Sequence, residues 1–308
     1  MIISVCPNPS VDITVSVNKF ICGGLNRITG ETVTFSGKGV NVIKAFSKLG
    51  GNGIATGFMF LEDADSFAKD LSSYGIIPDF VMQSGKVRRN YKITESCGKL
   101  TELNGAGNPV TSDAKMQLLG KINALSKTAD AVVISGSLPS GCTPEFYGSM
   151  VSAVQGKCFK IADASGDMLL SAVKAGANFI KPNKKELEQL VGKELNDISQ
   201  MLSACRELIN AGTEIVLLSL GKDGAVICNN SASYYASAPK VDVKSAVGAG
   251  DSMVAASAKL LTENADIGEV LRSAVAAGTS AVMSEGTNLF LSEDYYRIYG
   301  KVSVSRID

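Results

Sequence analysis

The chain has 308 residues, of which 45% are hydrophobic and 19% are charged, and its 30 basic residues balance its 30 acidic residues. This composition is ordinary for a globular protein, and the balance gives no global field that would attract nucleic acid or an anionic membrane. There is no histidine and the seven cysteines form no C-x-x-C pair, which excludes common zinc sites and Ser-His-Asp or Cys-His catalysis.

The N-terminal segment is not typical of a signal peptide, because it has no basic region and reaches Pro7 after a short apolar run. The chain also has no stretch of about 18 consecutive apolar residues, the length that a membrane span requires. With an odd number of cysteines, these features favour a cytoplasmic protein with no membrane partner.

The first third of the chain predicts strands of two kinds. The apolar run Met1–Cys6 is typical of a buried strand, whereas Val11–Val17 alternates apolar and polar residues, as a strand with one solvated face does. Further strands are predicted at 29–35, 54–58, 79–82, 90–95 and 100–103, and helices at 40–49 and 64–74. The half-polar strands cannot lie inside a sheet covered on both faces, so we expect a small lid sheet built from roughly residues 11–36 and 86–106.

From residue 112 onward, helices and strands alternate. Helices are predicted at 112–125, 144–154, 167–175, 184–191, 198–211, 252–261 and 267–283, and strands at 131–135, 159–163, 178–181, 214–219, 225–228 and 233–236. This alternation predicts a mostly parallel sheet with right-handed crossovers, and a single α/β domain over residues 1–308. Ligands of such sheets bind at the carboxyl ends of the strands, where the polar turns gather.

The most informative turn is Gly248-Ala249-Gly250-Asp251, which a helical pattern follows at once. Glycines let a backbone approach an anion closely, and a helix that starts there directs its free N–H groups and positive dipole end at that anion. A carboxylate in this position suits a base that accepts a proton from a hydroxyl, so the turn indicates phosphoryl transfer to an alcohol. The alternative is that Asp251 only caps the helix.

Two turns in the N-terminal part are candidate sugar sites. Asp12, where the first strand leads into the lid, suits the binding of two sugar hydroxyls, although a turn with local hydrogen bonds is the alternative. The second turn opens the helix at 40–49. Its Gly37 and Gly39 allow a sugar or its phosphate to approach the backbone closely, and its Lys38 and Asn41 offer hydrogen-bond donors. A helix start capped by Ser36 explains the same pattern.

A cluster of cations lies at the start of a predicted lid strand. Arg88, Asn90 and Lys92, together with Arg27, could clamp a phosphate carried by the substrate, since guanidinium groups bind phosphate oxygens in pairs. A solvated edge strand, protected by its charges from aggregation, is the alternative.

Two later turns also follow predicted strands. In Lys181-Pro182-Asn183-Lys184-Lys185-Glu186, Asn183 could contact a nucleotide phosphate and Glu186 could hold Mg²⁺ through water. A turn with a helix-initiating Glu is the alternative. The segment 219–224 could carry a ribose or adenine, or could simply be a hairpin turn.

The order and spacing of these pieces together resemble the ribokinase-like sugar kinases of the phosphofructokinase B family over essentially the full chain. The resemblance lies in Gly37 to Asn41 and in Ser245-Ala246-Val247-Gly248-Ala249-Gly250-Asp251-Ser252, with Asn-Pro-Ser-x-Asp, Ser-Gly-Ser-Leu-Pro, Lys-Pro-Asn-x-x-Glu and Ser-x-Gly-x-x-Gly in family order. It implies a three-layer α/β/α fold with a mostly parallel central sheet and a small β-sheet lid. Ser36 departs from the family pattern, which usually has glycine there.

The resemblance also implies ATP-dependent phosphorylation of a sugar hydroxyl, with Mg²⁺ as a cofactor. Asp251 would be the base, and the N–H groups of Ala249, Gly250 and Asp251 would form the anion hole. ATP and magnesium would be bound by Lys181, Asn183, Glu186, Ser219, Gly221 and Gly224, and the sugar by Asp12, Gly37, Lys38, Asn41 and Ser137.

Within the family, the sequence is similar to the hexose-phosphate branch, because cations such as Arg88 and Lys92 in the lid suit a substrate that already bears phosphate. We therefore expect fructose 1-phosphate as the substrate and fructose 1,6-bisphosphate as the product. Tagatose 6-phosphate is the first alternative, followed by fructose 6-phosphate or an unphosphorylated sugar. A half-exposed lid suggests a homodimer formed through the lids.

Two further classes of protein fit the sequence less well. A silent sugar-binding regulator would not need the intact turn from Gly248 to Asp251. A dinucleotide oxidoreductase would need a G-x-G-x-x-G after the first strand, and the sequence has none there.

Overall fold

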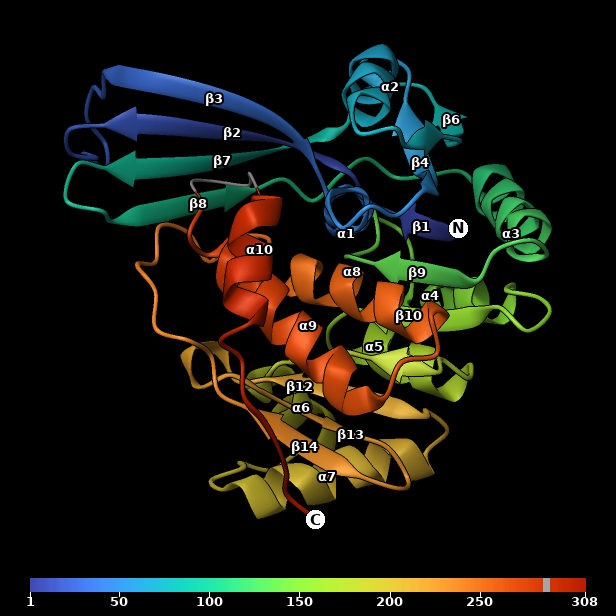
Figure 1. Cartoon of the computed structure of the whole chain (residues 1–308). Coiled ribbons are helices and arrows are strands. Elements are labelled where there is room, and N and C mark those ends of the chain that lie inside the picture. Colours follow the sequence, from blue (N-terminus) through green and yellow to red (C-terminus); the bar gives the residue numbers. More distant parts are fainter. Residues whose placement is uncertain (285–288) are drawn as a thin grey trace.

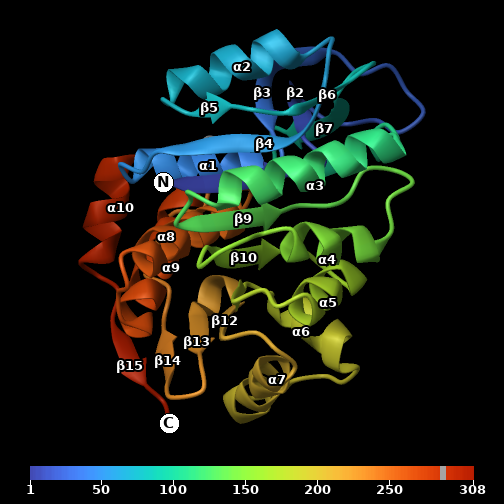
Figure 2. The same ribbon diagram turned by 90° about the vertical axis from the view of Figure 1, so that its right-hand side faces the viewer.

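The structure is a computed structural model that describes residues 1–284 and 289–308. The described residues form a sheet of 11 strands and a separate sheet of four strands. In Figure 1 the four-stranded sheet projects from one side of the body, while the larger sheet lies inside the body. Figure 2 shows helices on both faces of the larger sheet. The predicted three-layer α/β/α fold with a mostly parallel sheet is confirmed.

The centre of the large sheet consists of parallel strands with no solvated face. β1 (Ile2–Cys6) and β9 (Ala131–Ser135) are neighbours, and every residue of both is buried. Strands covered by helices on both faces need apolar residues on both, which explains these apolar runs. The order is β15-β14-β13-β12-β11-β10-β9-β1-β4-β5, with β6 also paired to β4.

The remaining strands of this sheet are β4 (Gly53–Phe60), β5 (Ile77–Pro78), β6 (Val81–Gln83), β10 (Phe159–Asp163), β11 (Phe179–Ile180), β12 (Ile215–Ser219), β13 (Ala225–Cys228), β14 (Ser233–Ala236) and β15 (Val304–Arg306). The last three pair in an antiparallel manner and the others run parallel. The parallel strands therefore present their carboxyl ends at one edge of the sheet.

Two helical layers enclose the large sheet (Figure 2). One layer contains α1 (Lys38–Lys48), α8 (Ala249–Thr262), α9 (Ile267–Ala281) and α10 (Ser292–Tyr299). The other contains α3 (Ser112–Ser126), α4 (Pro144–Ser152), α5 (Asp167–Lys174), α6 (Lys184–Val191) and α7 (Ile198–Asn210), while α2 (Ala64–Ser73) packs beside β4 and β5. No helix among the described residues is both long and apolar enough to cross a membrane.

The small sheet consists of β2 (Ser10–Val17), β3 (Ile28–Ser36), β7 (Arg88–Glu95) and β8 (Leu100–Asn104), in the order β3-β2-β7-β8. Successive residues of a strand point to opposite faces, so the register sorts its side chains into two sets. One face carries a polar set of Asp12, Asn90, Asn104, Lys92 and Glu102. The opposite face carries a row of cross-strand neighbours, Val33, Ile13, Tyr91 and Leu103.

Several element boundaries differ from the sequence predictions. The strand predicted at 79–82 is replaced by two shorter strands, β5 and β6, and the strand predicted at 178–181 is reduced to β11. The sequence patterns did not predict α10 or β15. Both are short, and β15 is a three-residue edge strand whose existence depends on pairing with β14.

Candidate active site

The N-terminal turn of α8 places a carboxylate beside free backbone N–H groups. Gly248 is the N-cap, with a φ of 81°, and Asp251 is the third residue of the helix. The first N–H groups of a helix have no intrahelical acceptor, and the positive end of the helix dipole lies there. The predicted start at Ser252 was wrong by three residues, because Gly248 adopts a left-handed conformation and starts the helix at Ala249.

Asp251 is buried, and the side-chain amide of Asn41 donates a hydrogen bond to it. Burial raises the pKa of Asp251 to about 6, and the negative charge of Asp163 adds to the rise, whereas Lys38 and the hydrogen bond from Asn41 oppose it. A carboxyl group with this pKa is mostly ionised at neutral pH and is more basic than an ordinary aspartate. It is therefore suited to accept a proton from a substrate hydroxyl.

A cavity of about 470 Å³ lies between the start of α8 and the polar face of the small sheet. Its lining includes the predicted site residues Asp12, Gly37, Lys38, Asn41, Arg88, Asn90, Lys92, Lys181, Asn183, Glu186, Ser219, Gly248, Gly250 and Asp251. Glu102, Asn104 and Asp163 also line it and were not predicted. The fold thus gathers segments from both sheets around one polar space, which we call the polar cavity.

Asp12 is held in a network within the small sheet. Lys92 forms an ion pair with Asp12 Oδ2 at 2.9 Å, and Asn90 and Ser10 donate to Oδ1, each at 2.8 Å. Burial by itself would raise the pKa of Asp12, but Lys92 and the donors lower it. A carboxylate accepts about four hydrogen bonds, so about one acceptor position of Asp12 remains for a ligand. Because Lys92 is paired with Asp12, Lys92 is not an isolated cation.

A second buried carboxylate lies between two lysines. Asp163, the last residue of β10, approaches Lys38 Nζ at 3.2 Å through Oδ2 and Lys181 Nζ at 3.4 Å through Oδ1. Burial would raise the pKa of Asp163, but the charges of Lys181 and Lys38 lower it to about 2. The same carboxylate raises the pKa of Lys38. Asp163 could have been identified from the sequence, because it is a polar residue at the carboxyl end of a predicted strand.

Arg88 binds the backbone where the small sheet joins the body. Its guanidinium donates to the carbonyl oxygens of Asn8 at 3.2 Å, Pro9 at 3.4 Å and Gly105 at 3.2 Å. Asn8 and Pro9 lead into β2, and Gly105 follows β8. One side chain therefore ties together two of the connections between the small sheet and the body, while still lining the polar cavity.

Three predicted site residues lie outside both cavities. Arg27 is exposed beside the end of β3 that is remote from the polar cavity, where Ile28 pairs with Val17. Ser137 is exposed and accepts a hydrogen bond from the amide of Asn8 at 3.3 Å. Gly39 packs against β1, where a Cβ would lie 2.7 Å from the carbonyl oxygen of Val5. The roles predicted for these three residues stay predictions.

The start of α6 combines a structural role with a position at the site. Asn183 caps the helix by accepting a hydrogen bond from Glu186 N at 2.9 Å, and Glu186 Oε2 accepts one from Asn183 N at 2.8 Å. This capping box fixes both side chains at the edge of the polar cavity. Among the residues that the structure describes, no group of three acidic or cysteine side chains gathers to hold a metal ion.

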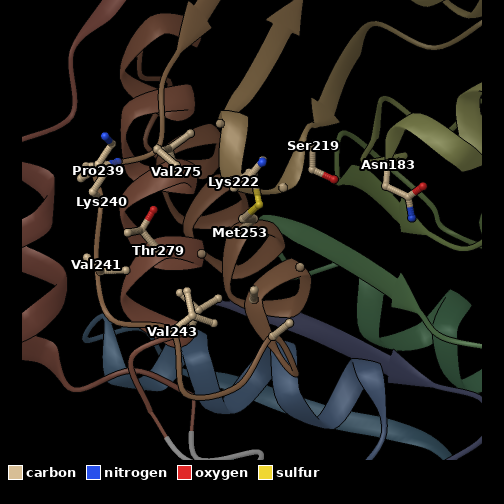
Figure 3. Close-up of a pocket in the computed structure, with 18 residues that line it drawn as sticks. Asn183, Ser219, Lys222, Pro239, Lys240, Val241, Val243, Met253, Val275 and Thr279 are labelled. Atoms are coloured by element: carbon tan, nitrogen blue, oxygen red, sulfur yellow. The ribbon is translucent and has the colours of Figure 1, made fainter. Parts of the chain in front are cut away.

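A second, mostly apolar cavity of about 680 Å³ adjoins the polar one and shares Asn183, Ser219 and Gly250 with it. Figure 3 shows Val275 and Thr279 of α9 facing Val241 and Val243 of the loop between β14 and α8, with Ser219 and Asn183 at one end. The remaining lining residues are Gly221, Lys222, Gly224, Ala238, Pro239, Lys240, Ala246, Ala249, Met253, Gly278 and Val282.

This apolar cavity has the size and lining that suit an aromatic base and its ribose. The sequence analysis identified one wall, the turn at 219–224. It missed the walls contributed by α9 and by the loop from Ala238 to Val243, because apolar residues at helical spacing give no sign that a cavity lies beside them.

Comparison with known proteins identifies the class of protein to which these two cavities belong. The family model described as pfkB family carbohydrate kinase matches residues 8–294. A 1-phosphofructokinase of Vibrio cholerae is 29% identical over 307 residues, 99% of this chain and 97% of that protein. A 1-phosphofructokinase of Escherichia coli K12 is 34% identical over 249 residues, 80% of each chain.

Solved structures agree with the sequence relatives. Phosphofructokinase-2 of Escherichia coli in complex with potassium superposes with a TM-score of 0.92 and 31% identity, covering 97% of this chain and 98% of that chain. The same enzyme in complex with fructose-6-phosphate gives a TM-score of 0.90 and 30% identity, with the same coverage. The chain belongs to the pfkB family of carbohydrate kinases, and it is a phosphotransferase that acts on an alcohol group. The family assignment made from the sequence is confirmed.

Proposed function

We propose that this protein is an ATP-dependent, magnesium-dependent kinase that converts fructose 1-phosphate to fructose 1,6-bisphosphate. The observation that carries the proposal is the position of Asp251 on the wall of the polar cavity, directly after Gly250, which lines both the polar and the apolar cavity. Relatives named 1-phosphofructokinase that match 99% and 100% of the chain support the choice of substrate.

In the proposed reaction, Asp251 accepts the proton of the sugar hydroxyl as that oxygen attacks the γ-phosphorus of ATP. The new O–P bond forms, the bond from phosphorus to the β–γ bridging oxygen breaks, and ADP leaves with that oxygen. The backbone N–H groups of Ala249, Gly250 and Asp251 face the negative charge of the transferring group. Phosphoryl transfer depends mainly on positioning and on stabilisation of this charge, so the N–H groups and nearby cations contribute more than the base.

On the sugar side, the polar cavity supplies groups for hydroxyls and for a phosphate. We assign Asp12, Gly37 and Asn41 to the sugar hydroxyls and Arg88, Asn90 and Lys92 to the phosphate end. The three carbonyl bonds of Arg88 leave some of its five N–H donors available. The small sheet covers this cavity, and we propose that it acts as the lid of the site.

On the nucleotide side, we assign the base and ribose to the apolar cavity between Gly224 and Thr279. Asn183 and Ser219 line both cavities, and Lys181 lines the polar cavity next to Gly250, so all three suit the phosphates. Mg²⁺ is commonly held by one or two carboxylates, with water and substrate phosphates completing its shell. Glu186, a carboxylate that lines the polar cavity and forms a capping box with Asn183, fits that pattern, and the bound ion would neutralise charge on the phosphates.

We also propose that two copies associate through the apolar face of their small sheets. The side chains of Val33, Tyr91 and Leu103 are 48%, 42% and 55% exposed, and they form one row with Ile13. A row of exposed apolar side chains across a sheet marks a site of protein association. A second copy presents the same row, so the two faces are complementary under twofold symmetry.

The substrate proposal can be tested by measuring ADP release with fructose 1-phosphate, tagatose 6-phosphate, fructose 6-phosphate, fructose and ribose. We expect the highest kcat/KM with fructose 1-phosphate. A higher value for fructose or ribose would contradict a hexose monophosphate as the substrate.

A further inference from the structure

We infer that Asp163 is a positioning residue for phosphoryl transfer, which holds Lys38 and Lys181 in front of the N-terminal turn of α8. The inference rests on the proposed function, because the two lysines would act on the transferring phosphoryl group. Both oxygens of Asp163 face lysines, so we infer that Asp163 acts through them.

The carboxylate of Asp163 is fixed more firmly than either lysine. Its side chain is 1% exposed, against 7% for Lys181 and 43% for Lys38. Ser135 Oγ donates to Asp163 Oδ2 at 3.0 Å, and the N–H of Gly136 donates to the carbonyl oxygen of Asp163 at 3.0 Å. These contacts hold the carboxylate at the end of β10, where it sets the position of both ammonium groups.

The two lysines converge on the candidate catalytic turn from different elements. Lys181 directly follows β11 and lies against Gly250, where a Cβ would be 3.3 Å from Lys181 Nζ. Lys38 is the first residue of α1, the helix that also carries Asn41, the hydrogen-bond partner of Asp251. Both ammonium groups therefore line the same polar cavity as Asp251.

Two ammonium groups brought this close would repel each other in a partly buried site. The buried carboxylate between them compensates for this repulsion, so the two ammonium groups can lie side by side. Without Asp163, we expect the more exposed lysine, Lys38, to turn toward solvent or lose its proton. The site would then lose a cation where negative charge develops in the reaction.

The central test is Asp163→Asn, which keeps the side-chain volume and an acceptor for Ser135 but removes the charge. With fructose 1-phosphate and ATP, we expect kcat to fall on the order of 10²-fold, while both KM values change by less than about threefold. The matched control is Asp79→Asn, which breaks the ion pair of Asp79 with Lys121 away from both cavities and should leave kcat unchanged. An Asp163→Asn variant with wild-type kcat would overturn the inference.

A double-mutant cycle separates positioning from an independent role. Residues that act as one unit lose function together, so Asp163→Asn combined with Lys38→Met should be no more than about twofold slower than the slower single variant. A double variant whose loss equals the product of the two single losses would contradict the inference. If Asp163→Asn does not fold, Ser135→Ala replaces it, with a smaller loss of kcat and the same non-additivity expected. No change in kcat with Ser135→Ala, or additivity with Lys38→Met, would count against the inference.

A third measurement needs no catalytic activity. Lysines labelled with acetic anhydride are quantified by peptide mass spectrometry, with Lys121 as the internal reference. Lys38 should label faster in Asp163→Asn, or in Ser135→Ala if Asp163→Asn does not fold, than in the wild type, and equal labelling would contradict its pairing with Asp163. A wild-type protein without sugar-phosphate kinase activity, but with this change in labelling, would refute the proposed function while supporting the ion pair on which the inference depends.

Discussion

Asn41 Nδ2 donates a 2.8 Å hydrogen bond to Asp251 Oδ2, although the two residues are 210 positions apart in the chain. The amide of Asn41 is oriented in turn by Ser36, whose hydroxyl donates to Asn41 Oδ1 at 3.2 Å. Ser36 is the residue that departs from the glycine usual in the family pattern, and here it is buried beside the candidate base. The start of α1 therefore sets the environment of a carboxylate on α8.

Replacing the candidate base should abolish most of the phosphoryl transfer. For Asp251→Asn we expect kcat with fructose 1-phosphate to fall about 10²–10⁴-fold, the range that general-base catalysis contributes. ATP affinity should be nearly unchanged, because the apolar cavity is intact. Steady-state kinetics and nucleotide titration check both parts, and a variant with wild-type turnover would remove Asp251 from the mechanism.

The same variant should change how stability depends on pH. The pKa of Asp251 is raised by burial to about 6 from the ordinary value of 3.8 for an aspartate, so the folded state binds this proton more tightly than the unfolded chain. The resulting stabilisation is fully present below about pH 4 and is lost as the pH rises through 6. Asp251→Asn, which carries no charge, should therefore gain thermal stability relative to the wild type between pH 4 and pH 7. Thermal unfolding at both pH values tests this, and a constant difference in Tm would contradict it.

Removing the hydrogen bond to Asp251 should move the acidic limb of the pH–rate profile. The bond from Asn41 lowers the pKa of Asp251, so Asn41→Ala should shift the limb of kcat/KM to higher pH. Ser36→Gly should produce a smaller shift in the same direction, because it frees the amide of Asn41 without deleting it. Asn108→Ala, which alters an exposed amide outside both cavities, serves as the control. A limb that stays in place or moves to lower pH would disprove the coupling.

Arg88 should be needed for the attachment of the small sheet as well as for its charge. Arg88→Lys keeps the charge but cannot reach three carbonyl groups with one ammonium group. We expect a loss of about 1–3 kcal/mol in the free energy of unfolding and a higher KM for the sugar phosphate, with the KM for ATP unchanged. Denaturant unfolding and initial-rate kinetics measure these quantities. If only the KM for the sugar phosphate changed, the carbonyl contacts of Arg88 would make no contribution to the free energy of unfolding.

The proposed dimer predicts a specific effect of charge on the small sheet. Leu103→Glu places a carboxylate in the row formed with Tyr91, where two copies would meet, so light scattering after size exclusion should show a monomer at micromolar concentration. Leu61→Glu is the matched control, because Leu61 is 60% exposed and follows β4 in the large sheet. A Leu103→Glu protein that elutes as the wild type does would place the interface elsewhere.

The sequence by itself determined the fold class and most of the residues that line the polar cavity. Apolar runs such as those of β1 and β9 indicate strands buried on both faces, and the alternation in β2 indicates a two-faced sheet. The polar turns were predictable because parallel strands place their carboxyl ends at one edge. Glycines also indicate turns in the sequence, because they adopt left-handed conformations readily, as Gly248 does with a φ of 81°.

Only the tertiary structure decided which partners these side chains have. The pairing of Asp12 with Lys92, the position of Asp163 between two lysines, and the use of Arg88 on backbone carbonyls all join segments far apart in the chain. A residue type and its spacing indicate what a side chain can do. Its burial and neighbours determine whether its charge is free, paired or shifted in pKa, and those depend on how the small sheet is placed over the edge of the large one.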